Sequence, residues 1–121
     1  MKYYENQIYP IGLVVAEIGE LESVREYFLD GNGKEISIID DCDACTMLLH
    51  KRKDSAFCNT PIGIFFNEKR TGISTISHEA FHATKYMLDM IGIQLSDYSE
   101  EAWAYLIGWI ASCIDCKKRR E

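Results

Sequence analysis

The residues best suited to chemistry lie close together near position 80. His78, Glu79 and His82 form the pattern H-E-x-x-H inside a segment of helical periodicity at residues 73–90. Residues four apart on a helix share one face, so His78 and His82 can present ring nitrogens to one metal ion. Glu79 lies about 100° round the helix, where it can reach a metal-bound water without binding the ion itself. The pattern predicts a Zn²⁺ site with a glutamate general base.

A catalytic zinc normally takes three protein ligands and leaves one position for water. Glu101 is the preferred third ligand. It lies on a second predicted helix, and the short connection between the two helices allows them to pack antiparallel and bring Glu101 back to the metal. Its helical face also carries Ala104 and Gly108, which would let the two helices approach closely. Glu100 stays open as an alternative that faces about 100° away. Asp97 is a further candidate and His50 a more remote one, whereas Asp89 lies nearly two turns beyond His82 on the same helix and cannot reach the same ion.

The motif at residues 78–82, followed by Glu101-Ala102-Trp103-Ala104-Tyr105, resembles the gluzincin type of zincin metallopeptidase, in its compact minigluzincin form. It is also similar to small proteins encoded by phages and mobile elements. The resemblance covers residues 74–112, about a third of the chain. It implies Zn²⁺ bound by His78, His82 and Glu101, with Glu79 as general base. It further implies an edge strand, assigned here to residues 62–66, that pairs with an extended protein or peptide substrate.

The expected reaction is metal-assisted hydrolysis of a peptide bond. Zinc polarises the scissile carbonyl and lowers the pKa of its bound water to about 7, while Glu79 takes the proton and passes it to the leaving amine. An oxyanion donor is also needed, and its unranked candidates are Tyr86, Tyr105 and His50.

A second hypothesis is a catalytically silent zinc-binding interaction protein of a phage or mobile element. The chain is short for building substrate walls, which also suggests a protein partner that completes the cleft. In addition, Tyr105 occupies a position where several relatives carry Asp or Asn.

The elements that must position these residues predict one α+β domain over residues 1–121, with a small mixed β-sheet packed against the H-E-x-x-H helix and a second, C-terminal helix. This arrangement would be zincin-like. Strands are expected within residues 7–18, 35–40, 46–50 and 62–66, the last two as a hairpin-like pair, and a helix within residues 19–30. Gly92 ends the key helix, and Thr71, Ser74 or Thr75 can cap its start.

The amino-acid composition limits the classes of molecule that the protein is expected to bind. The formal charge of −6 argues against nucleic acid, because phosphate binding needs clustered Lys and Arg. The basic run at residues 117–120 is interpreted as a solvated tail that complements the helix dipole. No segment matches a membrane span or a signal peptide, so we expect a cytoplasmic protein with no membrane partner.

The five cysteines include two C-x-x-C pairs, Cys42 with Cys45 and Cys113 with Cys116, and a single Cys58. Two such pairs can form a four-thiolate structural zinc site. Neither pair has the flanking Gly or Pro of a tight zinc knuckle, so the preferred interpretation is reduced and mostly buried thiols.

Overall fold

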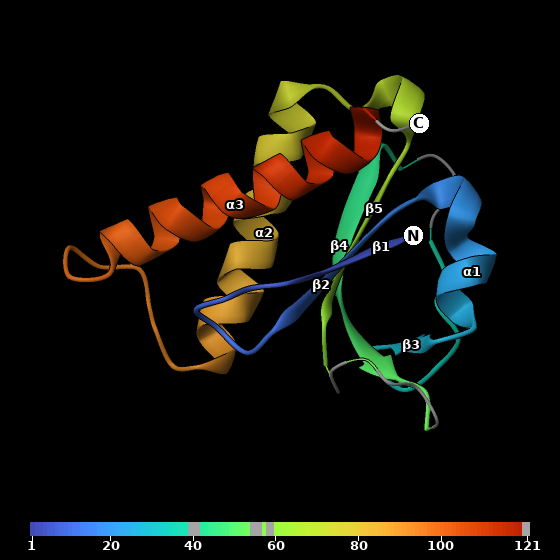
Figure 1. The fold of residues 1–121 in the computed structure, drawn as a ribbon, viewed down its shortest axis with the longest axis horizontal. Coiled ribbons are helices and arrows are strands. Elements are labelled where there is room, and N and C mark those ends of the chain that lie inside the picture. The colour runs from blue at the N-terminus through green and yellow to red at the C-terminus, as the bar shows by residue number, and fades with distance from the viewer. Residues whose placement is uncertain (39–41, 54–56, 58–59, 120–121) are drawn as a thin grey trace.

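The computed structural model describes residues 1–38, 42–53, 57 and 60–119, and shows one five-stranded sheet with helices on both faces (Figure 1). The strands are β1 (Lys2–Glu5), β2 (Gly12–Glu17), β3 (Phe28–Asp30), β4 (Ala44–Lys51) and β5 (Ile62–Phe66). The α-helices are α1 (Leu21–Arg25), α2 (Ile73–Met90) and α3 (Glu100–Arg119), with 3₁₀ turns at Ile18–Glu20 and Glu68–Arg70. No helix in these ranges is both long and apolar enough to cross a membrane.

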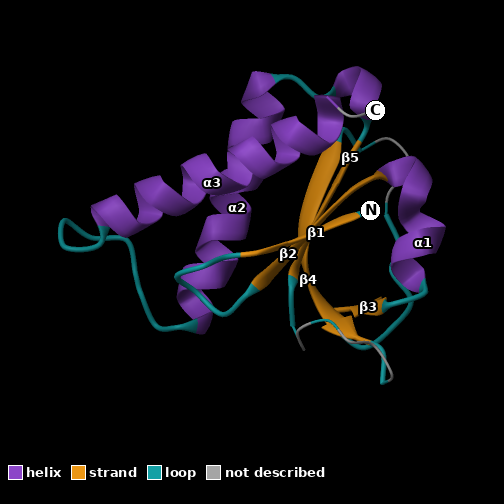
Figure 2. Ribbon diagram, in the orientation of Figure 1, coloured by secondary structure: helices purple, strands orange, loops and turns teal. Residues whose placement is uncertain are grey.

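The sheet is mixed, with strand order β1-β2-β5-β4-β3. Only the pair β2 and β5 is parallel; β1 with β2, β4 with β5, and β3 with β4 are antiparallel. Figure 2 shows α2 and α3 on one side of the sheet and α1 on the other. Both faces of the two central strands are therefore covered, which explains why β2 and β5 are almost continuously apolar rather than alternating.

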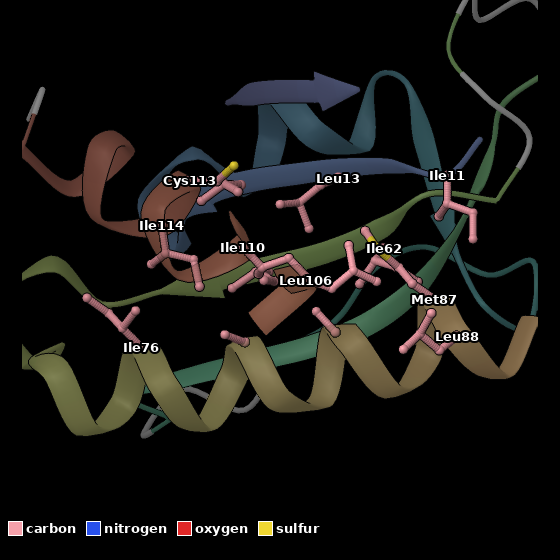
Figure 3. Packing of buried hydrophobic residues seen from close by; sticks show 14 of the residues in the cluster. Ile11, Leu13, Ile62, Ile76, Met87, Leu88, Leu106, Ile110, Cys113 and Ile114 are labelled. Atoms are coloured by element: carbon pink, nitrogen blue, oxygen red, sulfur yellow. The ribbon is translucent and has the colours of Figure 1, made fainter. Parts of the chain in front are cut away.

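Two hydrophobic clusters fill the layers. The larger one joins α2 and α3 to the sheet, with Leu13 and Ile62 from the strands, Met87 from α2 and Leu106 from α3 all fully buried (Figure 3). The smaller one lies under α1 on the opposite face and contains Val14, Val24, Phe28, Leu49 and Phe65 among its members. Successive strand residues point to opposite faces, so Leu13 and Val14 enter different clusters.

Several sequence predictions are confirmed. The fold is α+β with a small mixed sheet, the key helix spans residues 73–90, and the strands predicted at residues 46–50 and 62–66 form an antiparallel pair. Gly92 follows α2 with φ +78°, a left-handed conformation that glycine adopts without steric cost. The predicted side-chain cap of α2 is wrong. Its N-cap is Gly72, without a side-chain hydrogen bond, and the Thr71 hydroxyl donates to the Asn67 carbonyl at 2.6 Å instead.

The N-terminal half differs from the predicted strand and helix. The strand predicted at residues 7–18 is shorter than expected, because β2 begins only at Gly12, after Pro10, and β1 at residues 2–5 was not predicted. The predicted helix at residues 19–30 ends early, since Phe28 turns into the core and starts β3. No strand is present at residues 35–38, where the Arg25 guanidinium donates to the Ile36 carbonyl; the end of that predicted strand lies outside the described residues.

The predicted edge strand is also wrong. β5 lies in the centre of the sheet, hydrogen bonded to β2 on one side and to β4 on the other. All five of its residues are buried, which suits a strand covered on both faces and paired at both edges. β3 pairs with β4 only at residues 49–51. Among the described strands, none pairs with the outer edge of residues 44–48, although Gly31 lies against the Leu48 carbonyl at one end of it.

The basic run at the end of α3 is not solvated along its whole length, because its first residue anchors the helix. Lys117 is buried, and its ammonium lies 2.9 Å from the Glu20 carboxylate, which also accepts a hydrogen bond from the Met1 ammonium at 2.9 Å. Burial alone would raise the pKa of Glu20, but the bonds from Lys117, the Glu17 backbone and the Met1 ammonium lower it to about 2. The solvated-tail interpretation is therefore wrong for Lys117.

Candidate metal centre

The two histidines of the motif lie side by side on α2. Their Nε2 atoms are 3.1 Å apart, and their ring centroids are 4.7 Å apart. With zinc–nitrogen bonds of roughly 2.0–2.1 Å, this separation corresponds to an N–Zn–N angle of about 100°, near that of a tetrahedral site. The His78 side chain is 66% exposed, so an ion can reach the pair from solvent. His78 and His82 therefore fit as two ligands of one zinc ion.

Glu79 is held differently from its histidine neighbours. Only 7% of the residue is exposed, and its Oε1 accepts a hydrogen bond from the Thr46 hydroxyl at 2.9 Å. Its other oxygen, Oε2, lies 3.8 Å from the His78 Nε2. The carboxylate thus lies beside the histidine pair, with Oε1 engaged by Thr46 and Oε2 on the side of the His78 ring.

The packing of α2 produces this arrangement. Ile76, Ala80, Ala83 and Met87 recur every three or four residues and form the buried stripe against the sheet. The two alanines are small, which lets the helix lie close to the strands. Glu79 borders this stripe on the side of β4, whereas the histidines lie farther round the helix toward solvent.

A hollow of about 330 Å³ opens between the start of β4 and the first turns of α2. It is lined by Asp43, Ala44, Ser74, Thr75, His78 and Glu79. The candidate base and one candidate ligand therefore face a space that could receive part of a substrate.

The prediction of which face of α3 packs against α2 is wrong. α3 packs through its apolar stripe of Trp103, Leu106 and Ile110, and the Trp103 ring lies 5.6 Å from the Phe81 ring. Ala104 and Gly108, on the predicted face, are exposed. Burial of large apolar side chains outweighs the closer approach that small residues allow.

As a consequence, the structure does not bring Glu101 to the histidine pair. Both Glu101 and Glu100 are exposed at the start of α3. Among the described residues, no group of three His, Cys, Asp or Glu side chains is placed to hold a metal ion. The described residues thus fit two of the three expected ligands, and the third ligand stays a prediction.

The remaining candidates are dispersed. Asp97 is exposed in the connection between α2 and α3, and the His50 Nε2 lies 3.1 Å from the Gly31 carbonyl. Of the possible oxyanion donors, Tyr86 lines a small hollow of about 140 Å³ together with His82 and Lys85. Tyr105 is 44% exposed on α3.

The cysteine pairs lie on opposite faces of the sheet. Cys45 packs against the cluster under α1, whereas Cys113 belongs to the cluster under α2 and α3. Burial raises the pKa of each of these two thiols to about 12. Both belong to the four described cysteines, all of which are free thiols. Because the sheet separates the pairs, the structure does not assemble a four-thiolate site; Cys58 lies outside the described residues.

Thr46 is the site residue that sequence reasoning missed. It is 33 positions from Glu79 and belongs neither to the C-x-x-C pair at residues 42 and 45 nor to the motif at residues 78–82. Only the packing of α2 against β4 brings the two together, and the residue spacing contains no signal for that contact.

Comparison with known proteins adds no relative. A scan against protein-family models finds no match, and searches of curated proteins and of solved structures find no significantly similar protein.

Proposed function

We propose that the protein is a cytoplasmic zinc-dependent peptidase that hydrolyses peptide bonds in a protein or peptide substrate. One observation carries the proposal. Two histidine Nε2 atoms lie 3.1 Å apart beside a buried carboxylate whose Oε2 is 3.8 Å from one of them. This combination supplies two metal ligands and a general base in one place.

In the proposed reaction, His78 and His82 hold the metal, with Glu101 as the expected third ligand and Glu100 as its alternative. Bound Zn²⁺ supplies Lewis-acid polarisation of the scissile carbonyl. Glu79 takes a proton from the attacking water at Oε2, the oxygen that Thr46 does not engage, and then donates it to the leaving amine. Tyr86, beside His82, is the best-placed donor to the developing oxyanion.

The resemblance to gluzincins implies that an extended substrate pairs with an edge strand. With β5 in the centre of the sheet, the outer edge of residues 44–47 in β4 takes that role in our proposal. The hollow lined by Asp43, Ala44 and Glu79 lies at the start of β4, and we propose that a peptide added to this edge passes the general base there.

The test is cleavage of an unstructured peptide library by the purified protein supplied with zinc, with new termini identified by mass spectrometry. We expect cleavage that a zinc chelator abolishes and added zinc restores. Cleavage that persists in chelator would contradict a metal-dependent reaction. Bound zinc without cleavage would instead support the catalytically silent interaction protein.

A further inference from the structure

We infer that Thr46 is a positioning residue that holds the Glu79 carboxylate in its working orientation. This inference rests on the proposed function, in which Glu79 is the general base. Thr46 belongs to β4 and pairs with Ile64 of the central strand β5, so its backbone is fixed by the sheet. Its side chain bridges the sheet to the catalytic face of α2.

The hydroxyl of Thr46 has two acceptors within reach on the same residue. Oγ1 lies 2.9 Å from the Glu79 Oε1 and 3.3 Å from the Glu79 carbonyl oxygen. A hydroxyl has one proton and can donate fully to only one acceptor. The shorter contact, to a charged oxygen, is the stronger one because charge-assisted hydrogen bonds exceed neutral ones.

The consequence for Glu79 is geometric. A glutamate side chain has several rotatable bonds, whereas β-branched threonine is stiff at χ1, so the strand sets where the carboxylate lies. With Oε1 engaged by Thr46, Oε2 is left on the side of the His78 ring, 3.8 Å from Nε2. Without that bond the carboxylate is free to rotate away, and a misplacement of about 1 Å at a reacting group can cost about 100-fold in rate.

Thr84 provides a matched control on the same helix. It is fully buried, and its hydroxyl donates to the Ala80 carbonyl at 2.8 Å within α2. Replacing Thr84 removes a hydroxyl from the core side of α2 without touching Glu79. A general loss of packing or helix stability would therefore affect the Thr46 and Thr84 variants alike.

The experiment compares wild type, Thr46→Val, Thr46→Ser and Thr84→Val in three measurements: kcat and KM for a cleaved peptide, zinc content, and the crystal structure around Glu79. Thr46→Val keeps the shape and loses the hydroxyl, so we expect kcat to fall by about 10- to 100-fold with KM and zinc content unchanged. The serine variant keeps the hydroxyl and should recover most of the activity. Thr84→Val should keep wild-type kcat.

Wild-type kcat in Thr46→Val, or an equal loss in Thr46→Ser, would overturn the inference. If the wild-type protein binds zinc but cleaves nothing, the proposed function fails, and the crystal structures still decide the role of Thr46. A Glu79 carboxylate that moves in Thr46→Val and returns in Thr46→Ser supports positioning. An unmoved carboxylate in Thr46→Val overturns it.

Discussion

The two helices that cover one face of the sheet place the glutamates of the candidate site in opposite environments. On α2, Glu79 is buried and hydrogen bonded to β4, beside two histidines. At the start of α3, Glu100 and Glu101 are exposed, and Figure 1 shows this end of the helix extending away from the sheet. Residue spacing within one helix therefore determines which of its side chains lie together, whereas a ligand on another helix depends on how the two helices pack.

The largest effect on cleavage is expected at Glu79, the buried glutamate of α2. Glu79→Gln keeps the shape of the side chain but removes the base, so we expect cleavage to fall by about 100- to 10,000-fold while zinc content is unchanged. Peptide hydrolysis and elemental analysis on the same preparation check this. Unchanged cleavage in Glu79→Gln would exclude the proposed mechanism.

The next-largest effect, on zinc affinity, is expected at the exposed glutamates at the start of α3. If Glu101 completes the site, Glu101→Ala should weaken zinc binding by about 10- to 100-fold or more, measured by competition with a chromophoric chelator. Because Glu101 is exposed, the free energy of unfolding of the zinc-free protein should change by less than about 0.5 kcal/mol. Glu100→Ala is the matched control. Loss of affinity in Glu100→Ala alone would assign the ligand to Glu100.

A smaller effect concerns the other end of α3, which Lys117 anchors to Glu20. Glu20→Gln should lower the free energy of unfolding at pH 7 by about 1–3 kcal/mol, because it removes the charged acceptor that lies 2.9 Å from the buried Lys117 ammonium. The pKa of Glu20 is lowered from 4.5 to about 2 in the folded protein, so its contribution is full above pH 4.5 and is lost as the pH falls toward 2.

Urea unfolding of wild type and Glu20→Gln across this pH range measures that contribution. Glu22→Gln is the control, since its carboxylate is 86% exposed in its pair with Arg25 and should contribute less than about 1 kcal/mol. A pH-independent difference between Glu20→Gln and wild type would show that the ion pair does not anchor α3.

The smallest effect is expected at the cysteines. Cys116→Ser breaks one C-x-x-C pair, but the two pairs lie on opposite faces of the sheet, so the zinc content should not change. Elemental analysis of this variant checks the point. A second zinc in wild type that disappears in Cys116→Ser would require the pairs to meet.

Much of the fold could be predicted from local pattern. The apolar repeat of α2 gave its limits, and the strongly apolar runs of β4 and β5 gave a correct antiparallel pair. The order of strands could not be predicted, because placing β5 in the centre depends on its parallel pairing with β2, 49 positions earlier at Leu13 and Ile62. Phe28 was predicted to lie in a helix but begins β3, because its side chain is buried in the cluster under α1. That burial likewise depends on tertiary packing.

The candidate site divides along the same line. His78, Glu79 and His82 share one helix turn, so their proximity follows from residue spacing alone. Thr46 reaches Glu79 only through tertiary packing and was missed. The predicted contact of the Glu101 face with α2 failed for a similar reason, since Trp103 and Leu106 determine which side of α3 is buried.

Zinc binding by the histidine pair on α2 is tested by elemental analysis of the purified wild-type protein beside His82→Ala. We predict one zinc ion per chain in wild type and none in His82→Ala, with both proteins folded by circular dichroism. A wild-type protein that binds no zinc when the metal is supplied, or a His82→Ala variant that retains it, would contradict the account.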